Sequence, residues 1–212
     1  MTLAREELRK LALPALAAIL LIAAGAWLIS ISGESRALAR AQLAAALQAG
    51  HPIASEALGN RIYRGVSLGL PAFVDRLAWK TFAKVFLRDR QRQVLRGWNL
   101  RLEQTGLEGP LVPRQRKGAD FHFGHFHVEA AAGYTMPRPL PQALVLDYGR
   151  GGNPWFDPSN AIRDPIVAVN AGSAELLLGW TYLDLGALRV GTPSFFALEA
   201  VGPIEKSFDP PR

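Results

Sequence analysis

The stretch "DFHFGHFHVE", Asp120 to Glu129, alternates aromatic and imidazole side chains, and it holds three of the four histidines of the chain. Because successive residues of a β-strand point to opposite faces, this alternation predicts a strand. Gly124 interrupts it, and a glycine inside a strand often marks a β-bulge, which shifts the facing by one residue. With a bulge there, the phenylalanines and Val128 share one face and the histidines share the other. We therefore predict a bulged strand whose phenylalanine face helps to build the core.

The polar face of this strand carries the candidate metal ligands His122, His125, His127 and Glu129. Imidazoles two apart on a strand, with a carboxylate nearby, can supply three or four ligands for zinc or another divalent ion. An ordinary wet strand face is the alternative. A third use is pH sensing, because neighbouring imidazoles repel one another as they become charged. Without a bulge at Gly124, His122 leaves this set.

Most of the remaining chain also reads as short strands. The candidates are "RIYRGVSLGL", "QVLRGWNLRLE", "ALVLDY", "PIVAVN", "ELLLGWTYLDL" and "SFFALEAV". Turns rich in Gly, Pro and Asn separate them without intervening helices, which predicts an antiparallel sheet closing into a small barrel. Several strands, such as "ALVL", are apolar on both faces, so we expect an apolar interior.

One segment of this domain favours a helix instead. In "AFVDRLAWKTFAKVFLRD", after Pro71, apolar residues recur at helical spacing, although Phe82 and Phe86 also flank Lys84 in strand-like alternation. The helix makes the domain α+β, and it places four cations on one face: Arg76, Lys80, Lys84 and Arg88. We expect this basic face to meet anionic lipid or an acidic partner, with a solvated face as the alternative. No nucleic-acid-binding signature accompanies it, so nucleic acid is not an expected partner.

A different kind of segment precedes the strands. "LALPALAAILLIAAGAWLISISG", Leu11 to Gly33, has no charge over 23 residues. As a helix it extends roughly 34 Å, enough to cross a hydrocarbon core of about 30 Å, and it is longer than the apolar region of a signal peptide. We predict a single-pass membrane anchor. Its flanking cations favour an amino terminus in the cytoplasm and a domain outside: Arg5, Arg9 and Lys10 against Arg36 and Arg40.

Four parts follow from these patterns: a membrane anchor at 1–33, a helical stalk or linker at 34–60, a barrel domain at 61–203 and a tail at 204–212. The stalk begins with good helix formers, and Gly50 and Pro52 end the helix. The chain has no cysteine, which excludes disulfides, thiolate metal sites and cysteine nucleophiles.

A series of short landmarks runs along the barrel domain. They are Trp79, Lys84, Phe86, Asn99, Asp147, Tyr148, Asn153, Pro154, Arg163, Asp164, Leu177, Leu178, Gly179, Phe196, Leu198 and Glu199. In this order, from about Arg61 to Val201, they resemble a poorly characterised bacterial family of lipocalin-like β-barrel proteins, with Ala83 where that pattern has Gly. The resemblance implies a barrel and an apolar ligand, and no established activity.

The polar landmarks predict a second candidate cluster, either a buried ion network or the polar end of an apolar pocket. Its members are Trp79, Lys84, Asn99, Asp147, Tyr148, Arg163 and Asp164. Together these features predict a protein of the bacterial inner membrane. Its lipocalin-like domain would bind an apolar ligand or dock as an accessory subunit of a larger membrane complex. The competing hypothesis is an enzyme, metal-dependent or lipid-acting, that uses His122, His125 and His127.

Overall fold

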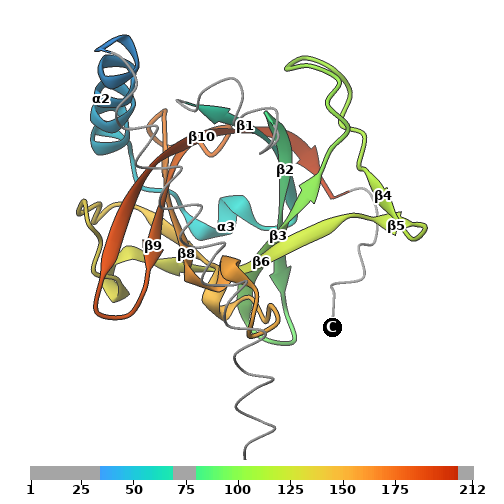
Figure 1. The fold of residues 1–212 in the computed structure, drawn as a ribbon. Helices are drawn as coiled ribbons and strands as arrows, with labels where there is room; N and C mark the ends of the chain where they lie inside the picture. The colour runs from blue at the N-terminus through green and yellow to red at the C-terminus, as the bar shows by residue number, and fades with distance from the viewer. Residues whose placement is uncertain (1–33, 69–79, 205–212) are drawn as a thin grey trace, which may run out of the picture.

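Eight antiparallel strands close into a barrel in the computed structural model, which describes residues 34–68 and 80–204 (Figure 1). Around the barrel the order is β1-β10-β9-β8-β7-β6-β3-β2, and each strand pairs antiparallel with its neighbours. The strands are β1 (Arg61–Leu68), β2 (Thr81–Asp89), β3 (Val94–Arg101), β6 (His122–Ala130), β7 (Leu144–Asp147), β8 (Ile162–Ala168), β9 (Leu176–Asp184) and β10 (Arg189–Pro203). A separate hairpin joins β4 (Gln115–Arg116) to β5 (Ala119–Asp120). The predicted antiparallel barrel is confirmed.

The helix predicted before Asp89 is wrong from Thr81 onward, because this segment is strand β2. Phe82, Lys84 and Phe86 alternate with Ala83 and Val85, so the first three face the interior. Lys84 is only 2% exposed and does not lie on a basic surface. Arg88, two residues beyond Phe86, pairs with Glu56 at 3.9 Å. The predicted basic face is therefore divided between the barrel interior and its end. Arg76 and Trp79 lie outside the described residues.

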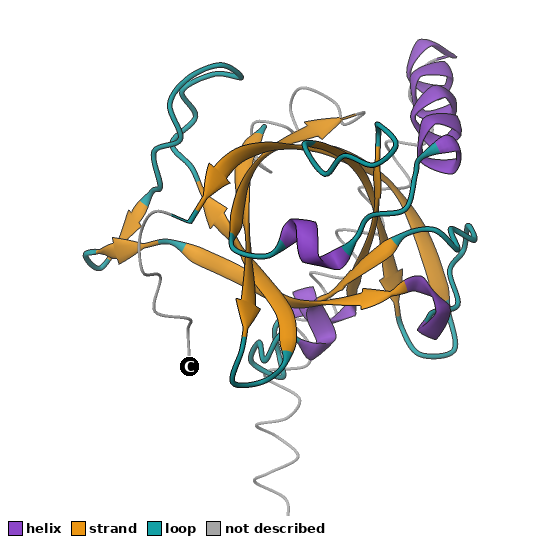
Figure 2. Ribbon diagram, turned by 180° about the vertical axis from the view of Figure 1, so that it is seen from behind, coloured by secondary structure: helices purple, strands orange, loops and turns teal. Residues whose placement is uncertain are grey.

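Aromatic side chains and a short helix fill one end of the barrel. Tyr63, Phe86 and Phe126 pack edge to face, with ring centroids 5.3 and 5.5 Å apart along the series. Helix α3 (Ser55–Leu58) inserts Leu58 into the same cluster, and Figure 2 shows α3 within the ring of strands. Fully burying each such side chain contributes about 1.5–3 kcal/mol. This end of the barrel is a solid core.

The outer face of the barrel is also covered. Leu47 of α2 (Glu34–Ala49) is fully buried against Val167, Leu178 and Trp180, and residues of the 131–143 segment, which begins with η1 (Ala131–Gly133), join this cluster. The strands that are apolar on both faces are explained by this double covering. The predicted helix of the 34–60 segment thus packs on the barrel in addition to connecting to it.

The β-bulge predicted at Gly124 is present. Gly97 pairs with Phe126 and Asn99 pairs with Phe123, so Gly124 and His125 together face one residue of β3. Gly124 has φ +53°, and a Cβ there would lie 2.9 Å from the Asn99 amide nitrogen, which is why a glycine is required. The bulge turns Phe123 and Phe126 to the same side of β6, as expected.

The anchor predicted at 1–33 and most of the tail lie outside the described residues. None of the helices within 34–68 and 80–204 is long and apolar enough to cross a membrane.

Candidate functional site

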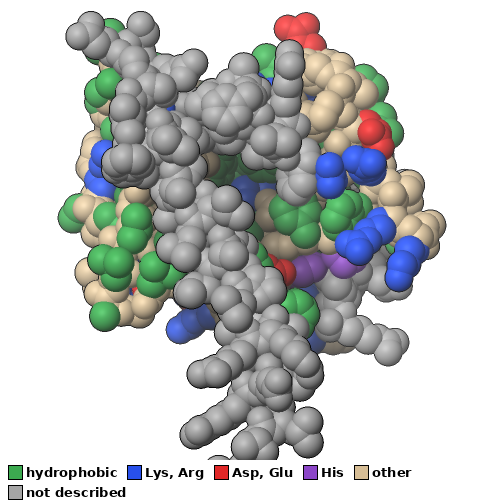
Figure 3. All heavy atoms as spheres, in the orientation of Figure 1, with side chains coloured by type: hydrophobic (Ala, Val, Ile, Leu, Met, Phe, Trp, Pro, Cys, Tyr) green, Lys and Arg blue, Asp and Glu red, His purple; other side chains and the backbone are tan. Residues whose placement is uncertain are grey.

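A cavity of about 280 Å³ lies inside the barrel, at the opposite end from the packed core. Its walls combine aromatic rings with a few polar groups: Ser67, Phe82, Lys84, Asn99, Phe123, Gly124, Tyr148, Ser159, Ile162, Asp164, Thr181, Ser194, Phe195 and Phe196. Figure 3 shows the molecule hollowed on this face. A concave, largely apolar space with a few convergent polar groups is the usual form of a small-molecule site.

Lys84 organises the floor of the cavity. Its ammonium group donates to Asn99 Oδ1 at 2.8 Å, to Tyr148 Oη at 2.5 Å and to Asp164 Oδ2 at 3.3 Å. Tyr148 donates to the same carboxylate oxygen at 2.9 Å, and Thr181 donates to Asp164 Oδ1 at 2.7 Å. All three ammonium donors and both carboxylate oxygens have partners. The floor is a closed network in which one positive charge balances one negative charge.

Aromatic rings surround the same ammonium group. Lys84 Nζ lies 5.1–5.5 Å from four ring centroids, those of Phe82, Phe126, Tyr148 and Phe196. Cation–π attraction of this kind partly offsets the cost of removing the charge from water. Burial lowers the pKa of Lys84, and the charge of Asp164 opposes this shift. Burial also raises the pKa of Tyr148 well above its ordinary value, so the phenol keeps its proton and donates a hydrogen bond to Asp164.

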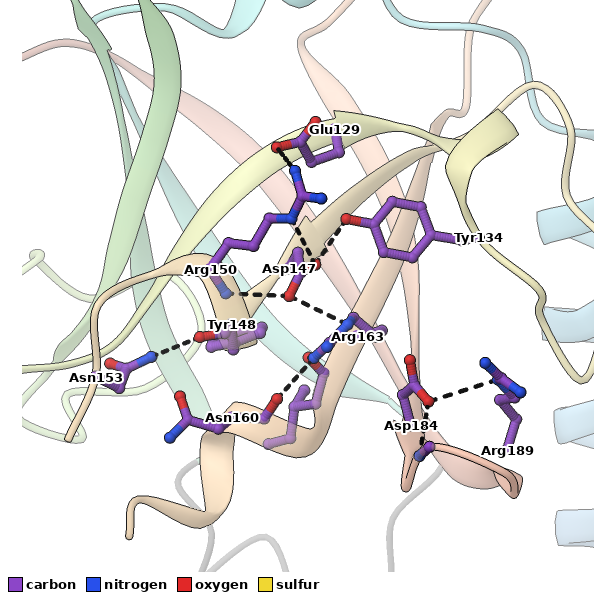
Figure 4. Close-up of polar contacts among 12 residues, drawn as sticks. Glu129, Tyr134, Asp147, Tyr148, Arg150, Asn153, Asn160, Arg163, Asp184 and Arg189 are labelled. Atoms are coloured by element: carbon purple, nitrogen blue, oxygen red, sulfur yellow. Dashed lines mark hydrogen bonds and ion pairs between the residues drawn. The ribbon is translucent and has the colours of Figure 1, made fainter. Parts of the chain in front are cut away.

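The predicted polar cluster divides between two sides of the sheet. Lys84, Asn99, Tyr148 and Asp164 meet in the cavity, whereas Asp147 and Arg163 form a separate outer network (Figure 4). Asp147 is bonded by Tyr134 Oη at 2.7 Å and lies 3.1 Å from Arg163 Nε, and Arg150 bridges Asp147 at 3.8 Å and Glu129 at 3.2 Å. The division follows from strand geometry, because sequence neighbours point to opposite faces.

The outer network lines a polar groove of about 600 Å³. Each of its three arginines, Arg150, Arg163 and Arg189, has a carboxylate within 3.5 Å: those of Glu129, Asp147 and Asp184. The charges of the groove are therefore matched.

The histidine face is spread along β6. His122 Nδ1 lies 3.2 Å from His125 Nε2, His127 pairs with Asp147 in the β6–β7 register, and Glu129 contacts Arg150. Within the described parts of the chain, no three His, Cys, Asp or Glu side chains gather into a group that could hold a metal ion. This face and the cavity lie on opposite sides of β6.

Asn153 holds the bulge in place. Its Oδ1 accepts a hydrogen bond from His125 N at 2.8 Å, and its Nδ2 donates to the carbonyl oxygens of His125 and Tyr148, each at 2.8 Å. The preceding Gly151 allows this close approach, because a Cβ there would lie 1.8 Å from His125 O. The sequence included Asn153 among the landmarks without indicating this role.

Changing Asn153 to alanine is expected to lower the free energy of unfolding by about 2–3 kcal/mol, because it removes three hydrogen bonds to the backbone of His125 and Tyr148. Urea denaturation measures this. Asn170→Ala, in an exposed turn, is the matched control and should change stability by less than about 0.5 kcal/mol. Equal effects of the two changes would show that the amide does not hold the bulge.

Sequence reasoning missed two hydroxyl groups of the cavity wall. Ser67 is 8% exposed, and neither its Oγ nor that of Ser159 on η3 (Pro158–Ala161) has a hydrogen-bond partner among the described residues. Along β1, Tyr63, Gly65 and Ser67 are two residues apart and face the barrel interior. This spacing could have predicted that Ser67 lines the interior.

The free energy of unfolding should fall on acidification, because the folded protein resists protonation of His125. Burial, followed by the charges of His122 and Arg96, lowers the pKa of His125 to about 4, and Asp157 opposes this shift. In the unfolded chain the imidazole of His125 binds a proton at about pH 6.5, whereas in the folded protein it does so only near pH 4. Stability is therefore lost as the pH falls from about 6.5 toward 4. We expect His125→Gln to remove about 1–2 kcal/mol of the loss between pH 7 and 4.5. Urea midpoints across this range measure it, with His51→Gln as the control, and an unchanged pH profile in His125→Gln would contradict the assignment.

The closed antiparallel barrel is consistent with the lipocalin-like fold that the resemblance implies. This agreement concerns the fold and not membership of the family. No family model, no curated protein and no solved structure matches this chain.

Proposed function

We propose that the barrel binds one small apolar molecule in the cavity above Lys84. The observation that carries this proposal is the concave space of about 280 Å³, lined by phenylalanine rings, beside a packed core. Protein interiors are close-packed, so a cavity of this size forfeits contacts unless something fills it.

The chemistry of the cavity supports an apolar ligand with at most one polar group inside. The charges of Lys84 and Asp164 balance each other and their hydrogen bonds are complete, so the floor has little to offer a second charge. The hydroxyl groups of Ser67 and Ser159 remain for a single hydrogen-bonding group of the ligand. Hydrophobic contact then supplies most of the affinity.

The volume sets the size of the ligand. If one chain carbon fills the roughly 30 Å³ of a water molecule in the liquid, a cavity of 280 Å³ holds about nine carbons. Burying about nine methylenes at about 0.8 kcal/mol each contributes about 7 kcal/mol, and the cost of immobilising the ligand is subtracted from this, so we expect a dissociation constant no tighter than about 5 µM.

Calorimetric titration with 1-decanol tests the proposal. We expect one saturable site per chain, and we expect Ser67→Phe to abolish it by filling the cavity. Ser173→Phe, in a turn between β8 and β9, adds the same ring elsewhere and should bind like the parent chain. Binding that survives Ser67→Phe, or no saturable binding to the parent chain, refutes the proposal.

We further propose that residues 11–33 anchor this domain in a membrane, from which an apolar ligand can be drawn. The support is the uncharged stretch of 23 residues. Membrane fractionation of the full chain and of a chain beginning at Glu34 tests this. Recovery of both in the same fraction would oppose it.

Docking on a larger membrane complex as an accessory subunit is a separate proposal. Trp155 and Phe156 are 66% and 51% exposed, with ring centroids 5.7 Å apart, and exposed aromatic pairs are frequent in interfaces. Affinity purification after mild solubilisation should recover stoichiometric partners that are lost in Trp155→Ala/Phe156→Ala. The same partner yield from both chains would oppose docking through this pair.

A further inference from the structure

We propose that Lys84 binds its ligand covalently: its amine forms an imine with a long-chain aldehyde whose chain fills the cavity. This inference rests on the proposed function, since it names the class of ligand for the same cavity. Lys84 is the only lysine among the described residues that line the cavity. A lysine amine in an apolar pocket is a nucleophile toward carbonyl carbons, with which it forms Schiff bases.

The amine of Lys84 faces the cavity and is shielded from bulk water. The residue is only 2% exposed, yet it lines the cavity. Along β2, Phe86 belongs to the packed core, whereas Phe82 lines the cavity, and Lys84 lies between the two on the same face of the strand. Nζ therefore lies where the packed core ends and the cavity begins. A ligand that fills the cavity brings one end of its chain to this amine.

The surroundings of the amine make its uncharged form reachable. Nζ lies 5.1–5.5 Å from four aromatic ring centroids. Burial lowers the pKa of Lys84, although the charge of Asp164 opposes this shift. Only the uncharged amine attacks a carbonyl carbon, so the lowered pKa favours the reaction. Asp164 Oδ2, at 3.3 Å from Nζ, is placed to accept the proton that the amine gives up.

Each proton of the reaction has a place to go. Nζ of Lys84 passes a proton to Asp164, and the freed electron pair forms a bond to the aldehyde carbon while the carbonyl π pair moves to oxygen. A proton then moves from nitrogen to that oxygen, which gives a carbinolamine. Asp164 returns its proton to the hydroxyl group, which leaves as water as the C=N bond forms. The ammonium group and the aldehyde thus become a protonated imine and water, without an oxidant or reductant.

The charge balance of the cavity floor favours an aldehyde over other reactive ligands. A protonated imine carries the same positive charge as the ammonium group, and its N–H can donate to Asp164 in the same way. Tyr148 keeps Asp164 as acceptor at 2.9 Å, and Asn99 Nδ2 donates to Tyr148 Oη at 3.4 Å. An acyl donor would instead turn Lys84 into a neutral amide and leave a buried carboxylate unpaired, which is strongly unfavourable.

Trapping with sodium cyanoborohydride tests the inference, because this reagent transfers hydride to the imine carbon and makes the bond permanent. The full chain is incubated with equimolar decanal and the reductant, then digested and mapped by mass spectrometry. We expect a decyl group on Lys84, although Lys117 in the β4–β5 turn is exposed and far more accessible to the reagents. Without the reductant no label should survive denaturation, because an imine hydrolyses in water.

Two variants and one competitor separate the cavity from the surface. Ser67→Phe should lose the label on Lys84 and keep any background label on Lys117, because the new ring fills the cavity. Ser173→Phe adds the same ring in an exposed turn and should be labelled like the parent chain. Excess 1-decanol occupies the cavity but has no carbonyl carbon, so it should protect Lys84 and leave Lys117 unprotected.

Four outcomes are decisive. A reductant-dependent label on Lys84 that Ser67→Phe removes and 1-decanol blocks supports the inference. A label confined to Lys117 and other exposed amines, while 1-decanol still binds, overturns it and leaves a non-covalent apolar ligand in place. A label on Lys84 that persists in Ser67→Phe also overturns it, because the amine then reacts outside the filled cavity. If 1-decanol shows no saturable binding and Lys84 takes no label, the proposed function itself fails.

Discussion

Replacing Lys84 with methionine should lower the free energy of unfolding by about 3–5 kcal/mol, although the new side chain is apolar and similar in length. The change leaves Asp164, which is 4% exposed, as a buried carboxylate without its balancing charge. It also removes the donor that joins Asn99 and Tyr148 across the cavity floor. Removing one partner of a buried ion pair costs more than removing both, because the remaining charge has neither water nor a counter-ion.

The double change Lys84→Met/Asp164→Asn is the control for this prediction. It removes the unpaired buried charge, so we expect at least half of the lost stability to return. Urea denaturation of the parent chain, Lys84→Met, Asp164→Asn and the double variant gives the coupling energy between the two residues. A loss below about 1 kcal/mol for Lys84→Met alone, or a double variant less stable than the single one, would contradict a closed ion network at the floor.

Changing Gly97 to alanine should cost about 2–3 kcal/mol, because the fold has no room for a single methyl group at this position. A Cβ there would lie 2.1 Å from Val85 O and 2.6 Å from the Phe126 ring. Val85 belongs to the paired backbone of β2, so it cannot move aside without disturbing the ladder. Phe126 is fully buried between Phe86 and Tyr148, and its ring cannot turn away cheaply.

Gly133→Ala is the matched control, since a Cβ there has no heavy atom within 4 Å. It should change the urea midpoint little. The prediction for Gly97 is contradicted if the two alanine variants unfold at the same urea concentration.

The barrel was predictable because its evidence is local. Alternation and turn residues located most of the strands, and the interrupted alternation at Gly124 located the bulge. Strand β2 was missed because a spacing of four residues is compatible with one face of a helix and also with one face of a strand. What decides between them is the partner of Lys84, and Asp164 lies 80 residues away in the sequence.

The candidate site was predictable only in part. The sequence predicts one polar cluster. Four of its members, Lys84, Asn99, Tyr148 and Asp164, meet in the cavity, whereas Asp147 and Arg163 lie in the outer groove. Strict alternation would have separated Arg163 from Asp164, because both are in β8. Alternation predicts which face of β6 carries the histidines. It does not predict whether they gather at one point, because that depends on their spacing along the strand.

Native mass spectrometry of the full chain, purified under mild conditions, tests ligand binding by the cavity most directly. We predict one apolar molecule bound per chain, lost in Ser67→Phe and retained in Ser173→Phe. A parent chain that carries no bound molecule under these conditions, or a Ser67→Phe chain that keeps one, would contradict a ligand site inside the barrel.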